Sequence, residues 1–550
     1  MRVRPASIPF KGRVISIIFV LAVGFISYAN SFSAPFQFDE YRFLTPNPFI
    51  ISGASVSSLH YDQELEKMVA HRYLVMLTFL LNYRMHGFEV EGYHVVNFVV
   101  HIISSLLVFW LVLSLFKTPF MNGAGIRYPS VSIAAFAGLI FAAHPVQTEA
   151  VTYIHQRSSS MAGMFFLLSL VLYLRWRLSP GAGSSGGRRR AWLWYAGSVL
   201  AAVCAMKSKE NAFTLPFVIV LCEFLFFGGR VRPRAVRLLP VLMTLLIIPL
   251  TSFLGLDWSL ERATWSGMNV TQAVSRTDYL LTQFRVIMTY LRLFFFPVNQ
   301  NFLYNYPVYH SFFTFAVFAS FVCLLFLFAL GGYLVYLSRR GNRGLRIIAF
   351  GIFWFFMTLS VESSFIPIPA LINEYRLYLP SVGFILSMVT AVFLVRERLT
   401  RAGMRFVVTA CLAGIVILFS GAAYARNNIW SGKIGFWQDV LKKSPGTAAP
   451  HNYLAMEYER LGMMDRAMVE YMASLAINPA DVETLLNVIM VLSEKGKQAD
   501  AVALLGETFR LGPDEANEAY ERIMELSGQG REQETKQFVR EMQRNMLSSR

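Results

Sequence analysis

The stretch HVVNFVVHIISSLLVFWLVLSLF, residues 94–116, contains no Lys, Arg, Asp or Glu. A helix of this length crosses the roughly 30 Å hydrocarbon layer of a bilayer. Similar apolar runs recur through the first 425 residues, and the whole chain is 55% hydrophobic, 15% aromatic and only 15% charged. An ordinary soluble domain does not have this composition. The sequence therefore predicts a polytopic, all-α membrane protein.

Eleven apolar runs are long enough to be membrane spans. They lie near residues 13–30, 94–116, 129–147, 159–176, 191–206, 211–229, 238–256, 312–337, 346–362, 377–395 and 405–425. The first run follows four basic residues, so a cleaved secretory signal is an alternative, and SFSA at 31–34 offers small residues for cleavage. We interpret the run as an uncleaved span, because the sequence downstream continues as a membrane protein.

The charge of the connecting loops predicts which side each one faces. Short basic loops, expected in the cytoplasm, lie at 117–127, 175–190, 230–237, 339–346 and 396–405. The alternate loops, expected outside, lie at 31–93, 148–158, 207–210, 257–311 and 363–376. The apolar segment 279–297 carries Gln283, Arg285 and Arg292, and we expect it to lie on or dip into the outer leaflet. The N-terminus is then cytoplasmic and everything after residue 425 is outside, as in a protein of a bacterial inner membrane.

The formal net charge of +16 does not indicate a nucleic-acid partner, because the basic residues cluster in these loops. The four cysteines all fall inside apolar segments and share no metal-ligand spacing: Cys204, Cys222, Cys323 and Cys411. The sequence therefore predicts neither a disulfide framework nor a metal site.

The sequence after residue 425 is polar and repetitive. Pro445, Pro479 and Pro513 recur at a spacing of 34 residues, which is the tetratricopeptide period. The consensus positions of the two good units are Leu454, Ala455, Tyr458, Gly462, Ala467 and Tyr471, then Val488, Ile489, Leu492, Gly496, Ala501 and Leu505. A third, degenerate unit has Arg522 and Thr535 at packing positions and is expected to be a polar cap. We predict a linker at 426–444 and a helical repeat solenoid at 445–550, whose generic function is to bind a peptide or protein.

Two adjacent carboxylates, Asp39 and Glu40, follow the first span within NSFSAPFQFDEYRFL, residues 30–44. Desolvation among the neighbouring aromatics would raise the proton affinity of a carboxylate toward the strength of a general base. Such a base can deprotonate an acceptor hydroxyl while a lipid-borne sugar phosphate leaves. The alternative is that the pair is only the first solvated turn after a span.

Other polar residues lie at the predicted outer ends of spans. HPVQTEAVTYIHQR supplies His144, Glu149, His155 and Arg157, KSKEN supplies Lys207, Lys209 and Glu210, and INEYRLYLP supplies Glu374 and Arg376. Cations placed in this way can hold a phosphate, although Lys and Arg near helix ends also snorkel without a functional reason.

One face of the second span is polar, with His94, Asn97 and His101 at i, i+3 and i+7. Polar residues inside a membrane are costly, so a shared face indicates either hydrogen bonds between helices or the lining of a substrate cavity. A metal site is disfavoured, because no carboxylate joins these histidines at ligand spacing.

Several of these blocks, in this order, resemble those of the transmembrane and tetratricopeptide-repeat O-mannosyltransferases. The blocks are NSFSAPFQFDEYRFL, HRYLVMLTFLLNYRMHGFEVEGYHVVNFVVH, FAAHPVQTEAVTYIHQRSSSMAGMFFLLSLVLY, KSKENAFTLP and NEYRLYLP. The resemblance runs from about residue 27 to 426 and continues through the repeats. It implies a GT-C glycosyltransferase fold over residues 1–425, and an inverting, metal-independent transfer of a sugar from a polyprenyl-phosphate carrier to a hydroxyl outside the membrane.

The resemblance also implies roles for individual residues. Asp39 would be the general base, and Glu40 would orient the acceptor. Arg157, Lys209 and Arg376 would bind the carrier phosphate. The cavity and acceptor region would include Arg72, His94, Asn97, His144, Glu149, Glu210 and Glu374. No cofactor is implied beyond the lipid-linked sugar.

The chain departs from the family pattern in two ways. Many relatives have two aspartates where this chain has Asp39 and Glu40, and animal relatives carry many more repeats. The short array favours a bacterial form that uses an undecaprenyl-type carrier. The main hypothesis is an enzyme that glycosylates a protein recruited by the repeats. The alternatives are a non-catalytic membrane scaffold and a flippase or transferase that acts on a glycan or lipid.

Overall fold

The computed structural model describes residues 10–53, 63–122, 129–179, 185–254, 274–368, 370–479 and 481–548. In these ranges the chain forms helices and no strand, which confirms the all-α prediction. The chain divides into two compact units. The first, which we call the membrane unit, comprises Met1–Glu261, Ser275–Gln300 and Pro307–Ser431, and the second, the repeat unit, comprises Arg262–Val274, Asn301–Tyr306 and Gly432–Arg550.

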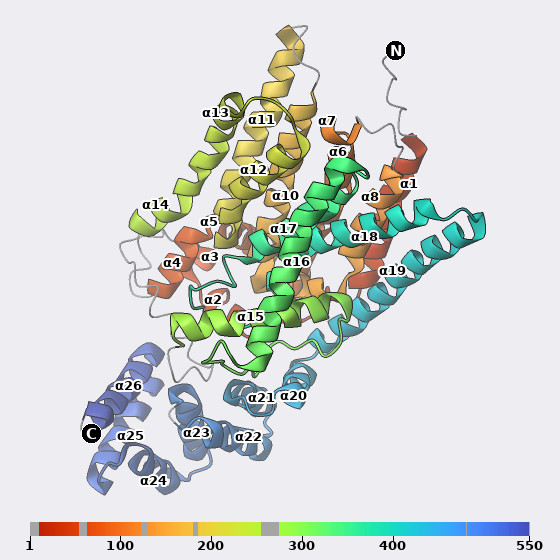
Figure 1. Cartoon of the computed structure of the whole chain (residues 1–550). Coiled ribbons are helices and arrows are strands. Elements are labelled where there is room, and N and C mark those ends of the chain that lie inside the picture. Colours follow the sequence, from red (N-terminus) through yellow and green to blue (C-terminus); the bar gives the residue numbers. More distant parts are fainter. Residues whose placement is uncertain are drawn as a thin grey trace, which may run out of the picture. The chain divides into compact units, whose positions relative to one another are not determined.

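The membrane unit is a bundle of long helices joined by short helices and turns (Figure 1). Its α-helices are α1 (Phe10–Tyr28), α2 (Asp39–Phe43), α3 (Pro48–Ser52), α4 (Gln63–His71), α5 (Tyr73–His86), α6 (Val90–Phe116), α7 (Pro119–Asn122), α8 (Ser130–Ala143), α9 (Thr148–Thr152), α10 (Arg157–Leu178), α11 (Ser185–Met206), α12 (Leu215–Phe226), α13 (Val231–Met243), α14 (Ile247–Leu254), α15 (Arg276–Phe295), α16 (Phe315–Arg340), α17 (Leu345–Leu359), α18 (Pro380–Arg398) and α19 (Ala402–Trp430). Its 3-10 helices are η2 (Pro145–Gln147), η3 (Ile154–Gln156), η4 (Glu210–Thr214), η5 (Thr244–Leu246) and η6 (Glu374–Leu377).

Seven helices in the described ranges are long and apolar enough to cross a membrane, and the count rises to eight if the bent pair Ser130–Ala143 and Pro145–Thr152 is one span. The chain is therefore a multi-pass membrane protein by length and composition. Three further predicted spans coincide with shorter helices, namely Ala191–Met206, α12 and Leu345–Leu359. The predicted total of eleven accordingly stays a prediction.

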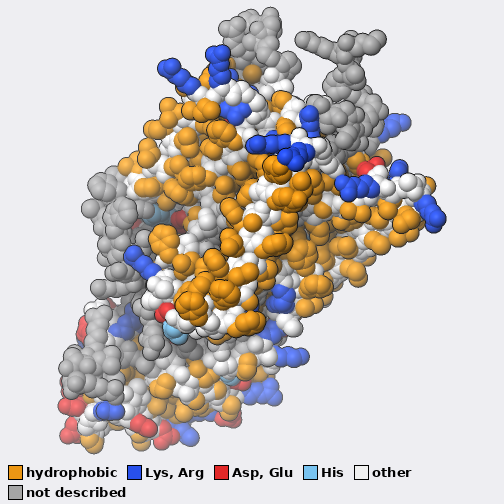
Figure 2. All heavy atoms as spheres, in the orientation of Figure 1, with side chains coloured by type: hydrophobic (Ala, Val, Ile, Leu, Met, Phe, Trp, Pro, Cys, Tyr) orange, Lys and Arg blue, Asp and Glu red, His pale blue; other side chains and the backbone are white. Residues whose placement is uncertain are grey.

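Helix α15 is not among the candidate spans of the described chain, although 279–297 is apolar. Figure 1 shows it running crosswise to α10, α11 and α12 at one end of the membrane unit. Lys and Arg side chains gather at the other end, and a hydrophobic band covers the helices between (Figure 2). This distribution is the one that cytoplasmic basic loops and an interfacial helix at the outer side would produce.

Helices α17 and α18 approach each other closely at two glycines. A Cβ atom added to Gly351 would lie 2.2 Å from the carbonyl oxygen of Gly383, and one added to Gly383 would lie 2.3 Å from the carbonyl oxygen of Gly351. Small residues allow this backbone contact between membrane helices. Any larger side chain at either position would force the two helices apart.

The repeat unit contains α20 (Lys433–Lys443), α21 (Ala448–Arg460), α22 (Met464–Ile477), α23 (Val482–Glu494), α24 (Gln498–Phe509), α25 (Pro513–Gly528) and α26 (Glu532–Ser548). From α21 onward these form three successive helix pairs. The glycines at the three intervening turns, Gly462, Gly496 and Gly530, have φ of 74°, 69° and 69°, a conformation that favours glycine. The small residues Ala455 and Ala467 are fully buried, as the repeat pattern predicts. Thr535, expected to be part of a polar cap, is buried as well.

The predicted linker at 426–444 is wrong. Helix α19 continues to Trp430, the boundary between the units falls after Ser431, and α20 occupies Lys433–Lys443. Phe436, Trp437 and Val440 are buried on one side of α20, so this helix is packed and not a free connection.

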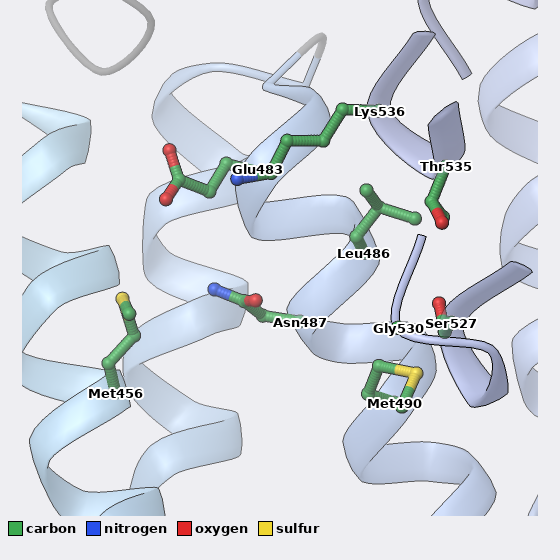
Figure 3. Close-up of a pocket in the computed structure, with 9 residues that line it drawn as sticks. All are labelled: Met456, Glu483, Leu486, Asn487, Met490, Ser527, Gly530, Thr535 and Lys536. Atoms are coloured by element: carbon green, nitrogen blue, oxygen red, sulfur yellow. The ribbon is translucent and has the colours of Figure 1, made fainter. Parts of the chain in front are cut away.

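A pocket of about 350 Å³ lies within the repeat unit (Figure 3). Side chains reach it from α21, α23 and α26 and from the end of α25. Its lining residues are Met456, Glu483, Leu486, Asn487, Met490, Ser527, Gly530, Thr535 and Lys536. The pocket combines apolar side chains with an amide and two opposite charges, a mixture that suits a peptide side chain.

Candidate active site in the membrane unit

The acid pair opens the short helix α2 and is buried. Asp39 and Glu40 are 6% and 1% exposed. The alternative of a solvated turn is therefore wrong for this structure. Phe38, directly before the pair, has φ of 45°, which is strained for a residue with a side chain and typically costs about 1–3 kcal/mol. Such strain persists where surrounding contacts impose it, and functional sites are common places for it.

Backbone donors on two segments hold Glu40 in position. One carboxylate oxygen accepts a hydrogen bond from the backbone N–H of Gln37, and the other accepts one from the N–H of His155 at 3.0 Å. Burial raises the pKa of Glu40 to about 8, although these backbone hydrogen bonds lower it, and the charge of Asp39 adds to the rise. Glu40 is thus a protonatable group near neutral pH, tied to η3.

Tyr153 lies against the acid pair and was not singled out from the sequence. The backbone N–H of Asp39 donates to the Tyr153 hydroxyl at 3.2 Å. Burial, followed by the charges of Asp39 and Glu40, raises the pKa of Tyr153 well above its usual value. The phenol therefore stays protonated and remains a hydrogen-bond donor at the acid pair.

Lys209 lies at the centre of a second polar group. Its ammonium donates to the Ser159 hydroxyl at 2.9 Å and pairs with Glu362 at 3.0 Å. It also lies 4.3 Å from the centre of the Tyr375 ring. Neither Glu362 nor Tyr375 was named from the sequence. Glu362 stands in no motif, whereas Tyr375 falls inside the NEYRLYLP block.

Arg72 and Glu210 form an ion pair beside Lys209. The guanidinium of Arg72 lies 3.3 Å from a carboxylate oxygen of Glu210, and the two side chains are 24% and 40% exposed. Burial would raise the pKa of Glu210, but the charge and hydrogen bond of Arg72, a backbone hydrogen bond and the charge of Lys209 together outweigh it and hold the pKa at about 2. Because the contact is long and partly exposed, a stronger anion can compete with Glu210 for Arg72.

His155 connects the two groups. Its backbone N–H binds Glu40, and its ring lies within electrostatic range of both Arg72 and Lys209. The ring also packs against Phe43 of α2, with ring centres 5.6 Å apart. The structure thus brings the acid pair, Arg72, Lys209 and Glu210 into one region.

Arg157 is buried and fully engaged by the protein. Its guanidinium donates to Asn97 at 2.6 Å, Asn82 at 2.7 Å, Thr78 at 3.1 Å and the carbonyl oxygen of Tyr93 at 2.9 Å. These contacts join α5, α6 and α10. The geometry supports a role in packing, and the assignment of Arg157 to the carrier phosphate stays a prediction.

A third group ties the segment around η2 and α9 to η6. The Glu149 carboxylate accepts from the backbone N–H of Tyr375 at 2.9 Å. Gln300 donates to Glu374 at 2.6 Å and to the carbonyl oxygen of Pro145 at 3.1 Å. These contacts hold the segment that carries Tyr375 against the segment that precedes His155.

Arg376 and His144 both bind backbone carbonyl oxygens. Arg376 donates to those of Ala370 and Leu371, at 2.7 and 3.3 Å. His144 Nε2 lies 2.9 Å from the carbonyl oxygen of Phe294 on α15. Arg376 is buried, and burial opposes its charge, but the neighbouring tyrosines and Glu362 more than compensate and raise its pKa.

The polar face of α6 forms hydrogen bonds between helices and loops. His94 Nε2 lies 2.8 Å from the carbonyl oxygen of Ala34, and Asn97 donates to that of Val151 at 3.1 Å. The His101 ring nitrogens lie 3.1 Å from the Tyr378 hydroxyl and 3.2 Å from the carbonyl oxygen of Ala142. Of the two interpretations left open by the sequence, this geometry favours packing.

In the part of the chain that the structure describes, no group of three or more His, Cys, Asp and Glu side chains is arranged to hold a metal ion. Metal independence itself stays a prediction. What the arrangement offers is a buried acid pair for proton transfer and two cations for an anionic group.

The chain is similar in sequence to protein O-mannosyl-transferases. It is 28% identical over 293 residues to protein O-mannosyl-transferase TMTC2 of Homo sapiens. This alignment covers 51% of this chain and 32% of that protein. It is 22% identical over 545 residues to protein O-mannosyl-transferase TMTC3 of Mus musculus. This alignment covers 92% of this chain and 55% of that protein. The chain thus spans about a third to about half the length of these relatives.

No family model matches the chain. The crystal structure of ArnT from Cupriavidus metallidurans bound to undecaprenyl phosphate aligns with 90% of this chain and 80% of that one, with a TM-score of 0.40 and 16% sequence identity.

Proposed function

We propose that the chain is a membrane glycosyltransferase of the GT-C type, which moves a sugar from a polyprenyl-phosphate donor to a Ser or Thr hydroxyl of a protein on the outer face of the membrane. The observation that carries this proposal is the connection of the buried acid pair to the Lys209 and Arg72 cations through His155. The sequence similarity to protein O-mannosyl-transferases supports it independently.

In the proposed reaction the acceptor oxygen attacks the anomeric carbon of the donor sugar, and the bond from that carbon to the phosphate oxygen breaks. Asp39 takes the proton of the acceptor hydroxyl, and the polyprenyl phosphate leaves with the bonding electron pair. Attack from the face opposite the phosphate inverts the anomeric carbon. A base in this position typically contributes a factor of about 10²–10⁴ to the rate.

The cations are assigned to the phosphate. Lys209 has three N–H donors, of which Ser159 and Glu362 each take one. Arg72 can exchange the partly exposed Glu210 for a phosphate oxygen. The assignment of Arg376 to the phosphate has less structural support, because its guanidinium already donates to two carbonyl oxygens.

The repeat unit is assigned to the recruitment of the protein acceptor. Its pocket is lined by Met456, Leu486 and Met490 (Figure 3). The Asn487 amide nitrogen donates to Asn452 at 3.1 Å, and its oxygen can accept from a peptide backbone. Helix-pair repeats commonly bind extended peptides in such concave surfaces.

The experiment that tests the proposal measures transfer of labelled sugar from polyprenyl-phosphate sugars to membrane and exported proteins, in purified membranes. We expect Asp39→Asn to lose at least about a hundredfold of the activity. The matched control is Asp278→Asn, which removes an aspartate whose ion-pair partner, His310, is largely exposed.

If labelled protein forms equally well with Asp39→Asn, and both variants are folded and several donors have been tried, the catalytic proposal fails. The non-catalytic scaffold then becomes the better account, because its peptide binding does not need the acid pair.

A further inference from the structure

Four buried polar atoms around Lys209 lack partners. His155 Nδ1, Ser158 Oγ, Asn211 Oδ1 and Glu362 Oε2 are shielded from solvent and have no hydrogen-bond partner among the residues that the structure describes. Each of the four side chains belongs to a residue that is at most 6% exposed. Buried polar groups in folded proteins are nearly always hydrogen-bonded, so each exception needs an explanation.

The four residues lie on segments that contact Lys209 or carry it. Glu362 binds it through its other oxygen, Oε1, at 3.0 Å. Ser158 adjoins Ser159, whose hydroxyl accepts from Lys209 at 2.9 Å. Asn211 is two residues further along the same segment, and the His155 ring lies within electrostatic range of the ammonium.

The chemistry of these atoms defines the missing partner. His155 and Ser158 are three residues apart across the junction of η3 and α10, a spacing that brings side chains onto one helix face. Their Nδ1 and hydroxyl groups can donate hydrogen bonds, which an anionic oxygen would accept. Asn211 Oδ1 and Glu362 Oε2 can only accept, so they need O–H or N–H donors.

We infer that Lys209, His155, Ser158, Asn211 and Glu362 form the subsite for the headgroup of a glycosyl phosphate. In this subsite His155 and Ser158 donate to phosphate oxygens beside the Lys209 ammonium. Asn211 and Glu362 accept hydrogen bonds from sugar hydroxyls and so select the sugar. The inference rests on the proposed function and extends it, because it assigns residues to the sugar as well as to the phosphate.

Binding and stability together test this subsite, with no need for turnover. The full-length protein is purified in detergent, and two probes are titrated: a short-chain polyprenyl phosphate and its mannosyl ester. His155→Leu should weaken binding of both probes about tenfold, since a hydrogen bond to a charged group is lost. Asn211→Ala should keep the wild-type affinity for the phosphate and lose about fivefold for the mannosyl ester.

The thermal midpoint measured without a probe shows whether the ring of a histidine stabilises the fold through hydrogen bonds. His101 provides the control, because both of its ring nitrogens are already bonded, to the Tyr378 hydroxyl and the Ala142 carbonyl oxygen. His101→Leu should lower the midpoint, because it strands those two partners. His155→Leu should leave the midpoint unchanged or raise it, because it removes an unsatisfied polar atom.

The outcomes distinguish this inference from the proposed function. A wild-type protein that binds neither probe would overturn the proposed function and the subsite with it. If the wild type binds both probes and the two variants bind them equally well, only the subsite is wrong and water satisfies the four atoms. A wild type that does not distinguish the mannosyl ester from the phosphate overturns the assignment of Asn211 and Glu362 to the sugar.

Discussion

Replacing Glu40 by Gln should make the protein less sensitive to alkaline pH. Glu40 is almost fully buried, and burial raises the pKa of its carboxyl to about 8 from an ordinary value of 4.5. The folded state therefore binds this proton more tightly than the unfolded state does. The stability that protonated Glu40 gives is fully present below pH 4.5 and is lost progressively as the pH rises toward 8.

The magnitude follows from the size of the shift. One pKa unit corresponds to about 1.4 kcal/mol, so the full penalty for ionising buried Glu40 is about 5 kcal/mol. Most of it, about 4 kcal/mol, develops between pH 5 and pH 9. Gln has nearly the shape of protonated Glu and does not ionise. The amide nitrogen of Gln cannot accept one of the two backbone hydrogen bonds that the Glu40 carboxyl accepts, so Glu40→Gln should be less stable than the wild type by about 1–3 kcal/mol near pH 5. Relative to the wild type, the variant should then gain about 4 kcal/mol between pH 5 and pH 9.

The measurement is the thermal midpoint of the purified protein in detergent from pH 5 to 9, for the wild type, Glu40→Gln and a control. Glu89→Gln is the control, because Glu89 is exposed to water before α6 and its substitution should leave the profile parallel to that of the wild type. The difference between the midpoints of the variant and the wild type should shift by several degrees in favour of the variant from pH 5 to pH 9. Parallel profiles for Glu40→Gln and the wild type, or a variant that loses stability faster at high pH, would refute the reasoning.

Three further substitutions and one control test the packing of the membrane unit. Glu223→Gln breaks a bidentate ion pair, at 2.9 and 2.8 Å, between fully buried Glu223 and Arg177, whose side chain is 15% exposed, and should cost about 3 kcal/mol in thermal unfolding. Gly351→Ala forces α17 and α18 apart and should cost about 1–3 kcal/mol or more by the same assay, whereas Gly414→Ala, whose Cβ would meet nothing within 4 Å, should be neutral or slightly stabilising. Arg157→Met should lower the thermal midpoint sharply, as expected for about 3–5 kcal/mol, and leave the affinity of the folded protein for polyprenyl phosphate unchanged. A fall in that affinity would instead support the phosphate role predicted from the sequence.

Much of the fold follows from local sequence patterns. Apolar runs such as 94–116 mark helices because a bilayer requires them, and the glycines at 34-residue spacing mark turns because they adopt positive φ. The linker prediction failed for a related reason. Helix α20 lies before the first proline-to-proline unit, so its amphipathic pattern was not in register with the repeat and only its packing reveals it.

The site was less accessible to sequence reasoning, because its parts come from distant segments. The burial of Asp39 and Glu40 depends on contacts with Tyr153 and His155, more than a hundred residues away. Glu362 carries no motif, and its role beside Lys209 is set by tertiary packing alone. Conversely, Arg157 looked like a phosphate ligand in sequence, but its four protein partners lie on helices whose relative positions no local pattern fixes.

The structure also gives a reason why this chain has Glu40 where many relatives have a second aspartate. The Glu40 carboxylate reaches back to the N–H of Gln37 and across to the N–H of His155. The same residue thereby holds the turn that places Asp39 and the segment that leads into Ser159, the partner of Lys209. Because a glutamate is one methylene longer than an aspartate, it can reach both of these segments. In the proposed function the second acid thereby links the segment of the base to the segment of the phosphate site, and backbone donors hold its buried carboxyl in that position.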